Sequence, residues 1–251
     1  MRRIAVPVIT IILFLLFWEW LVWFNDWPNY KMASPSDLGP SFWKYKTLFF
    51  SFGWDTLWRT VAGLLISIVV GVALGMVMGF SKLLQEGLYP LLIGFNAIPK
   101  ATIVPILSLI FIGQHDFNTV LIAFLISFFP IAVSVSIGLS TLEPEYRDIL
   151  RALGASKLTI FWKIALPKTL PEFFGALKVA VTLAFIGTNL MEIVSPHGRG
   201  LGALFDSGKT NSDYPLMFSV LIALAALGIM LYYFVVVLER IFAGWADQLS
   251  R

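Results

Sequence analysis

Three ionisable side chains stand inside long apolar stretches of the sequence: Lys100, Lys178 and Glu192. A charge inside a membrane is costly, so each must pair with another charge, reach the interface or face water. The two lysines would suit an anionic solute, although Lys178 is near enough to the end of its stretch to snorkel. Glu192 can pair with Arg59 or Arg199, either as an external gate or as a simple interfacial ion pair. All three are therefore candidates for lining a polar path.

The sequence carries no recognisable constellation for catalysis. It has no HExxH, no GxSxG and no GxxxxGK[ST] phosphate loop, and it contains no cysteine. Its two histidines, His115 and His197, have no companion ligands at metal-binding spacing. We assign no catalytic, cofactor-binding or metal-binding residue. A membrane-embedded enzyme, such as a lipid-modifying transferase or an intramembrane hydrolase, is nevertheless kept as an alternative.

The composition identifies an integral membrane protein. Of 251 residues, 58% are hydrophobic and 13% are charged, with 22 Phe and 9 Trp, which is far from the usage of soluble proteins. The formal charge of +3 is too small and too dispersed to suggest nucleic acid. We expect an all-α polytopic protein with about six transmembrane helices in the lipid membrane. The expected spans are 4–24, 56–80, 87–112, 118–141, 171–194 and 215–240.

Flanking charges and the N-terminal segment set the expected topology. The excess of Lys and Arg favours a cytoplasmic N-terminus, so that both termini are cytoplasmic. The first span follows Arg2 and Arg3 like a signal peptide, but it is long, rich in Phe and Trp, and lacks a small-residue cleavage site, so we expect a retained helix. We divide the chain into residues 1–55, the first helix and a periplasmic connector, and residues 56–251, a core domain with a charged cytoplasmic loop at 143–171.

Glycines in the second span predict close helix packing. Gly71, Gly75 and Gly79 recur at every fourth residue and lie on one helix face. Because glycine has no side chain, this face allows another helix to approach closely.

Prolines in the third span predict a kinked or broken helix. Pro90, Pro99 and Pro105 each remove a backbone donor. The freed carbonyls must face protein or water rather than lipid. Since such a helix often borders a path, Pro99 and Pro105 join Lys100 as pathway candidates.

The stretch at 143–171, EPEYRDILRALGASKLTIFWKIALPKTLP, is the one long charged segment. Helical spacing of apolar residues and arginines on another face predict a short amphipathic helix after Pro144. Gly154 can take the left-handed conformation that ends this helix. Ser156 can cap a second short helix that ends at Pro167 and Pro171. The apolar stripe consists of Tyr146, Ile149, Leu150 and Leu153. Lipid, the protein itself or a partner must cover it.

This segment resembles the EAA loop of the permease subunits of binding-protein-dependent ABC importers. The spacing from Gly154 to Ile164, Leu166 and Pro167 follows the pattern of that family without a gap. At the start, Asp148 keeps the acid, while Ile and Leu replace the two alanines. The resemblance implies that the segment couples to a cytosolic ATPase. The residues implied in coupling are Glu145, Tyr146, Arg147, Asp148, Ile149, Leu150, Arg151, Leu153, Gly154, Ala155, Ser156, Ile164, Leu166 and Pro167.

Other strings occur in the family order, among them TLWRTVAG, GVALGMVMG, IPKATIVPIL and GRGLGALF. They are similar to the branch that imports nitrate, sulfonates, taurine and pyrimidine-type vitamin precursors. The resemblance implies a type I importer permease fold in the bacterial inner membrane, with GRGLGALF as an outer re-entrant loop that docks on the binding protein. It also implies that two copies enclose the solute path, with a homodimer as the simpler arrangement.

The implied partners are a cytosolic ABC ATPase dimer, which would bind ATP and Mg, an extracytoplasmic solute-binding protein and a second permease copy. The chain itself would bind no cofactor. A noncatalytic membrane scaffold is the second alternative, and it predicts partner binding without solute-dependent ATP hydrolysis. The sequence leaves the solute open, because the binding protein usually makes the first selection.

Overall fold

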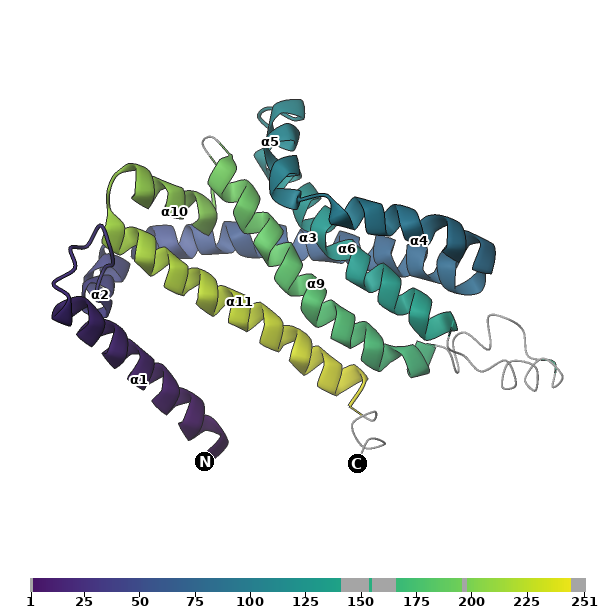
Figure 1. The fold of residues 1–251 in the computed structure, drawn as a ribbon, viewed down its shortest axis with the longest axis horizontal. Coiled ribbons are helices and arrows are strands. Elements are labelled where there is room, and N and C mark those ends of the chain that lie inside the picture. Colours follow the sequence, from purple (N-terminus) through teal and green to yellow (C-terminus); the bar gives the residue numbers. More distant parts are fainter. Residues whose placement is uncertain (1, 141–153, 155–165, 196–197, 245–251) are drawn as a thin grey trace.

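The computed structural model describes residues 2–140, 154, 166–195 and 198–244, and within these ranges every regular element is an α-helix (Figure 1). The expected all-α fold is thus confirmed for the described part of the chain. The helices are α1 (Arg2–Phe24), α2 (Pro35–Lys44), α3 (Lys46–Phe80), α4 (Lys82–Ala97), α5 (Lys100–Ile110), α6 (His115–Ser140), α9 (Leu166–Val194), α10 (Leu201–Thr210) and α11 (Tyr214–Phe242).

The membrane spans correspond to the expected set of about six. Among the described residues, α3, α6, α9 and α11 are long and apolar enough to cross a membrane. The pair α4 and α5 passes the same test together, although the two helices meet at 85°. The remaining expected span is α1, which is apolar over Ile9–Phe24.

Three predicted helix starts are wrong. Helix α3 begins at Lys46 rather than at residue 56, α4 begins at Lys82 rather than at residue 87, and α9 begins at Leu166 rather than at residue 171. Hydropathy detects the part of a helix that lies in lipid and is blind to polar or aromatic turns before it. At α9, Pro167 occupies the first turn, where backbone N–H groups have no intrahelical partner, and Pro171 lies inside the helix. The boundary drawn between residues 55 and 56 falls inside α3.

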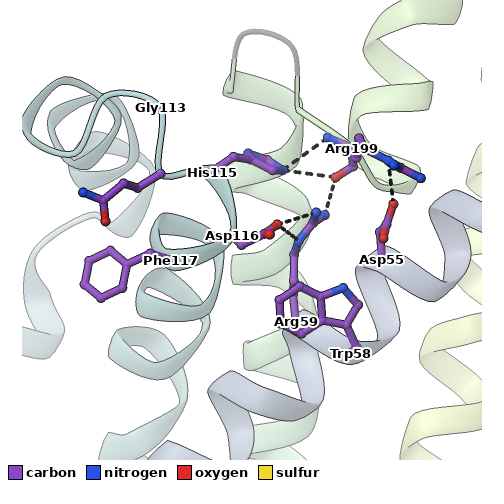
Figure 2. Close-up of a pocket in the computed structure, with 9 residues that line it drawn as sticks. Asp55, Trp58, Arg59, Gly113, His115, Asp116, Phe117 and Arg199 are labelled. Atoms are coloured by element: carbon purple, nitrogen blue, oxygen red, sulfur yellow. Dashed lines mark hydrogen bonds and ion pairs between the residues drawn. The ribbon is translucent and has the colours of Figure 1, made fainter.

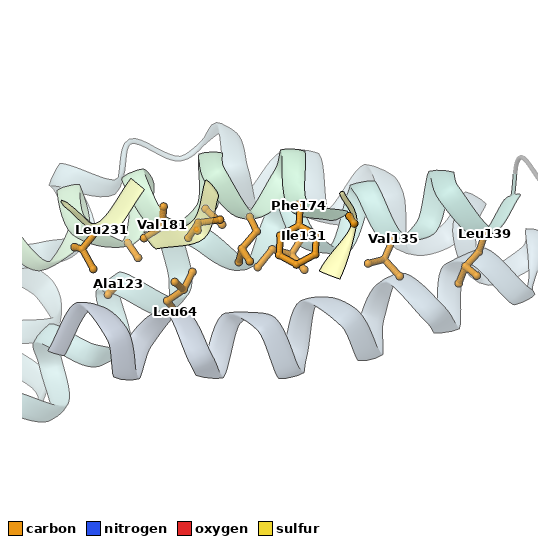
Figure 3. Close-up of a cluster of buried hydrophobic side chains, with 13 residues drawn as sticks. Leu64, Ala123, Ile131, Val135, Leu139, Phe174, Val181 and Leu231 are labelled. Carbon is orange, nitrogen blue, oxygen red and sulfur yellow. The ribbon is translucent and has the colours of Figure 1, made fainter. Parts of the chain in front are cut away.

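Helices α3 and α6 pack closely along a seam made by the glycines of α3. Figure 3 shows the buried apolar side chains of the adjoining cluster, among them Ile131, Val135 and Leu139 of α6. A Cβ atom added to Gly75 would lie 2.6 Å from the Cβ of Val135, and one added to Gly79 would lie 2.6 Å from the Cβ of Leu139. The same holds for Gly71, where the added atom would lie 2.9 Å from Ile131. The close packing predicted from the glycine spacing is confirmed, and a second helix face fills the space that side chains would occupy.

The main apolar core joins this seam to α9 and α11. Phe174, Val181 and Ala184 from α9 and Leu231 and Val235 from α11 are all buried in one cluster with residues of α3 and α6. Helix α1 lies outside this core and contacts mainly α2, through a small cluster around Trp18 and Val22. The four long helices therefore form the frame that positions the polar residues described below.

The third predicted span is broken, as its prolines predict. Helix α4 ends at Ala97 and α5 begins at Lys100, with Ile98 extended at φ −66° and ψ 126°. A residue before proline is forced towards this extended conformation, so Pro99 accounts for the break. Pro90 and Pro105 lie inside α4 and α5 instead.

Helices α6 and α9 run antiparallel, so His115 and Val194 lie at one end of the bundle and Ser140 and Leu166 lie at the other. In Figure 1 the start of α1 and the end of α11 lie on the same side of the molecule. The end that holds His115 also carries α10, between α9 and α11. This end contains most of the polar side chains of the frame.

Candidate functional site

Glu192 is the most deeply buried charge of this end, with 0% of its surface exposed. Its carboxylate accepts hydrogen bonds from three groups: the Thr56 hydroxyl at 2.8 Å, the Arg59 guanidinium at 3.3 Å and the Gly202 N–H at 3.0 Å. A buried carboxylate is tolerated only when it is paired and hydrogen-bonded in this way. The side chain of Glu192 thereby joins α9 to α3 and to the first turn of α10.

Arg59 extends this network to α6. Its guanidinium contacts Asp116 Oδ1 through Nη2 at 2.6 Å and Nε at 2.8 Å, and it also donates to the carbonyl of Arg199 (Figure 2). The Arg59 residue is 3% exposed, whereas 61% of the Asp116 side chain is exposed. The network thus begins at a buried carboxylate and ends at a carboxylate in contact with the outside. Arginine suits this role because its planar group donates in several directions.

Gly200 and Gly202 allow the backbone to reach Glu192. Gly200 has φ +127°, and a Cβ atom at this position would lie 2.0 Å from Glu192 Oε1. At Gly202 the added atom would lie 2.8 Å from the Asn189 carbonyl oxygen. At position 200 only glycine fits, because the φ angle is positive and the Glu192 carboxylate occupies the place of a side chain. Two of the three glycines in GRGLGALF, Gly200 and Gly202, are therefore accounted for by the buried carboxylate, whereas Gly198 lies against the His115 ring.

A depression of about 380 Å³ opens beside this network. It is lined by charged and aromatic side chains, including Trp58, Arg59, His115, Asp116 and Arg199. Arg199 pairs with Asp55 at 3.0 Å, and Figure 2 shows both across from His115. The depression offers hydrogen-bonding and charged groups to a contacting molecule.

His115 connects α6 to the segment after α9. Its Nδ1 lies 2.8 Å from the Ser195 hydroxyl, and its Nε2 lies 3.1 Å from the Arg199 carbonyl oxygen. Both ring nitrogens are therefore engaged with polar groups of the same connection. This arrangement positions the Arg199 backbone, which in turn accepts a hydrogen bond from Arg59.

Lys100 lies at the break between α4 and α5. Its ammonium group donates to the Phe95 carbonyl at 2.5 Å and lies 4.5 Å from the centre of the Phe95 ring. A carbonyl in the last turn of α4 is thus satisfied by a side chain that follows the break, as a broken membrane helix requires. A role for Lys100, Pro99 and Pro105 in lining a path stays a prediction.

Lys178 pairs with Glu239 at 2.9 Å, which joins α9 to α11. About a quarter of each side chain is exposed, 25% and 26%. Lys178 was expected to pair with another charge, to reach the interface or to face water, and the structure shows the ion pair. The pair lies on the side of the bundle away from Glu192, nearer to the end of α11.

Of the residues implied in coupling, the structure describes Gly154, Leu166 and Pro167. Residues 141–153 and 155–165 lie outside the described residues, and so do the candidates within those ranges. Gly154 has φ +81°, the left-handed conformation expected for it, and no atom of the described residues lies within 4 Å of a Cβ atom placed there. Leu166 and Pro167 form the first turn of α9.

Sequence reasoning found the Glu192–Arg59 pair but missed three members of its surroundings. Thr56, Asp116 and Asp55 were not singled out. The missed indication was the arginine itself: Arg59 already lies inside the expected span 56–80, and an intramembrane charge requires partners on neighbouring helices. The alternative pair of Glu192 with Arg199 is not present, since Arg199 pairs with Asp55.

The sequence of this chain is similar to those of known membrane proteins. Residues 67–244 match the sequence model described as "Binding-protein-dependent transport system inner membrane component". The formylaminopyrimidine transport permease protein ThiX of Halalkalibacterium halodurans is 32% identical over 203 residues, which is 81% of this chain and 80% of that protein. The nitrate import permease protein NrtB of Synechococcus elongatus is 30% identical over 161 residues, 63% of this chain and 56% of that one.

A solved structure shows the same fold. A chain of the MetNI methionine ABC transporter, in an inward-facing conformation, matches with a TM-score of 0.68 at 19% sequence identity, over 79% of this chain and 98% of that chain. At this identity the match concerns the fold alone. The helices described above therefore have the arrangement of a type I importer permease.

Proposed function

The chain belongs to the binding-protein-dependent transport system inner membrane component family, and on that premise we propose how it works within an ABC importer. The chain itself is a transport permease and not an enzyme, since its relatives are transport permeases and ATP hydrolysis belongs to a separate subunit. Two copies would enclose the solute path as a homodimer. A cytosolic ATPase dimer, holding ATP and Mg, would drive it, and an extracytoplasmic binding protein would deliver the solute.

The observation that carries this proposal is the family match, which spans residues 67–244 and so includes the charged segment at 143–171. That segment connects α6 to α9 at the end of the bundle away from Glu192. We infer that its apolar stripe fills a groove on the ATPase, because such a stripe between two membrane helices needs a cover. Arg147 and Arg151 would pair with acids at the rim of that groove.

The orientation follows from the same proposal. The segment at 143–171 would be cytoplasmic, which places Ser140 and Leu166 inside and His115 and Glu192 outside, in a bacterial inner membrane. Both termini would then be cytoplasmic, in agreement with the common side of the α1 start and the α11 end. The depression around Asp116 and Arg199 would face the binding protein.

The relatives indicate the kind of solute. Their names cover a pyrimidine and the nitrate anion, so the proposed solute is a small anion or a small polar molecule. A lipid-modifying enzyme or a noncatalytic scaffold has no comparable support. Glu192 is enclosed by its partners, so an external gate at this residue would require the whole cluster to open.

The proposal is tested by purifying the tagged full chain in mild detergent from native membranes and identifying every co-purifying subunit. We expect a stoichiometric ATPase with the natural sequence and its loss with Gly154→Arg, because the bulky charged side chain would enter the coupling contact. A stable natural permease that brings down no ATPase would contradict the coupling role and favour the scaffold.

A matched control is available in Gly113→Arg. Gly113 has φ +79°, nearly the same as Gly154, and it also has no atom within 4 Å of an added Cβ. It lies before α6, at the opposite end of that helix. This variant introduces the same charge and similar backbone strain, so we expect it to retain the ATPase. Equal loss in both variants would attribute the effect to folding rather than to coupling.

A further inference from the structure

A groove of about 520 Å³ lies in the corner between α2 and α3. Tyr45 alone separates the two helices, so their facing side chains stand close together, with the ring centres of Phe42 and Phe49 4.5 Å apart. The residues that line the groove are Gly39, Phe42, Trp43, Lys46, Phe49 and Phe50. We call these six residues the aromatic corner. They combine an apolar wall with a single positive charge.

The aromatic corner lies at the boundary between membrane and water. Helix α1 ends at Phe24 and the span α11 begins at Tyr214, and Figure 1 shows α2 beside both of these ends. The Tyr45 hydroxyl fixes the position, because it donates to Asp213 Oδ2 at 2.6 Å, directly before α11. Since membrane spans begin and end at the level of the lipid headgroups, the aromatic corner lies at that level.

The two faces of α2 have different surroundings. Leu38 is buried, and its carbonyl accepts a hydrogen bond from the Ser219 hydroxyl of α11 at 3.4 Å. Gly39 and Trp43, four positions apart, lie on another face and line the groove. Trp43 is 74% exposed and Phe50 of α3 is 83% exposed. At headgroup level, the acyl chain of a lipid is the apolar molecule available to cover such rings.

Lys46 gives the groove its positive charge. Its ammonium group lies 4.1 Å from the centre of the Trp43 ring, a cation–π contact that holds it at the rim. Among the described residues no carboxylate pairs with Lys46, whereas Lys44 lies 3.8 Å from Asp213 Oδ2. The described lining of the groove contains no Asp or Glu either. The charge is therefore available to an anion, and it would repel a cationic group such as choline.

We propose that the aromatic corner is a binding site for an anionic glycerophospholipid. The headgroup phosphate would accept hydrogen bonds from Lys46 Nζ, while an acyl chain would lie against Trp43 and Phe50. A free phosphate ion would meet the charge and leave the rings uncovered. The bound lipid would hold α2 in place, and with it α1, which contacts mainly α2. This inference goes beyond the transport function and holds whichever solute the permease carries.

The test uses the full chain, purified in mild detergent and stripped of lipid, and counts bound lipids by native mass spectrometry. Two probes with identical acyl chains are titrated: phosphatidylglycerol, which is anionic, and phosphatidylethanolamine, which has no net charge. We expect the first phosphatidylglycerol to bind at least about fivefold more tightly than the first phosphatidylethanolamine, because a lysine at the membrane surface contributes about this factor. Equal affinities would overturn the proposal, and so would displacement by glycerol phosphate, which has the phosphate but no acyl chain.

Two charge variants locate the headgroup. In Lys46→Gln, the preference for phosphatidylglycerol over phosphatidylethanolamine should fall to about one. Lys44→Gln is the matched control, because it removes the same charge two positions away, from a lysine that faces Asp213. It should keep the preference of the natural sequence. Equal loss in both variants would attribute the preference to general surface charge and overturn the site.

A steric variant locates the acyl chain. Gly39 lines the groove, and nothing lies within 4 Å of a Cβ atom placed there, so Gly39→Trp can fill the groove without a clash at its Cβ. We expect it to abolish the tightest binding of phosphatidylglycerol. Gly87→Trp adds the same side chain in open space on α4 and should bind the lipid like the natural sequence. Unchanged binding in a monodisperse Gly39→Trp protein would exclude the aromatic corner.

Discussion

Glu192 and Gly200 depend on each other at the level of single atoms. The carboxylate needs the Gly202 N–H, in the first turn of α10, and the hydroxyl of Thr56 within hydrogen-bonding distance. The backbone can come so close only because residue 200 has no side chain and takes a positive φ. The buried charge and the glycine are therefore one structural feature, although eight positions separate them.

We expect Gly200→Ala to lower the stability of the protein by more than about 2 kcal/mol, because strain at φ +127° adds to a clash with Glu192. Thermal unfolding of the purified protein in detergent measures the change. Gly53→Ala is the control: nothing lies within 4 Å of an added Cβ there, and alanine is a better helix former by about 1 kcal/mol. A Gly200→Ala protein as stable as the natural one would show that the loop can move away from the carboxylate.

At the same scale, sequence reasoning could name charges but not all of their partners. The cost of a buried charge is general, so Glu192 and Lys178 could be expected to pair. Which partner each would take depends on the three-dimensional path of loops and helix rotations. For this reason the sequence left Glu192 with two alternative partners, Arg59 and Arg199, and it named neither Asp116 as a partner of Arg59 nor Glu239 as a partner of Lys178.

At the scale of helices, the close packing of α3 against α6 follows directly from the spacing of glycines in the sequence. Glycines at every fourth residue of α3 leave one face of this helix without side chains. The facing helix must then carry side chains at the same spacing, as α6 does with Ile131, Val135 and Leu139. The sequence also predicts that the third span is kinked or broken. It does not predict at which proline, because the segment contains three prolines and two of them fit inside α4 and α5.

We expect Gly75→Leu to separate α3 from α6 and to reduce sharply the yield of monodisperse protein in size-exclusion chromatography. Val135 Cβ and the Ala132 carbonyl oxygen would lie 2.6 and 2.7 Å from the first added atom, and overpacking of this kind costs about 1–3 kcal/mol or more. Gly87→Leu, on α4 with nothing within 4 Å, adds the same side chain in open space and should behave like the natural sequence. Similar yields for both variants would argue against a tight seam.

For the whole molecule, the sequence was sufficient for the all-α membrane class and for the family. These properties depend on summed hydropathy and on motif order, which single contacts do not alter. Where helices begin outside lipid, and how cavities form between them, depends on packing and could not be predicted in this way.

The proposed orientation predicts which ends of the bundle face each side of the membrane. Since the chain contains no cysteine, single cysteines can be introduced at Lys209 in α10 and at Ser140 at the end of α6, both exposed. We expect a membrane-impermeant maleimide to label Lys209→Cys in intact spheroplasts and Ser140→Cys only after permeabilisation. Labelling of Ser140→Cys in sealed cells would reverse the orientation and the assignment of the cytoplasmic end.

The length of α3 has a consequence for how the protein sits in lipid. Its 35 residues make a rod of about 52 Å at about 1.5 Å per residue, whereas the hydrocarbon layer is about 30 Å thick. Even at a tilt of about 40°, the largest that is usual, the rod covers about 40 Å along the membrane normal. Part of α3 must then stand in the headgroup layers. With its first turns projecting on the outer side, Thr56 and Arg59 would lie buried near headgroup depth, and a delivered solute would meet the exposed carboxylate of Asp116, which pairs with Arg59, before any hydrocarbon.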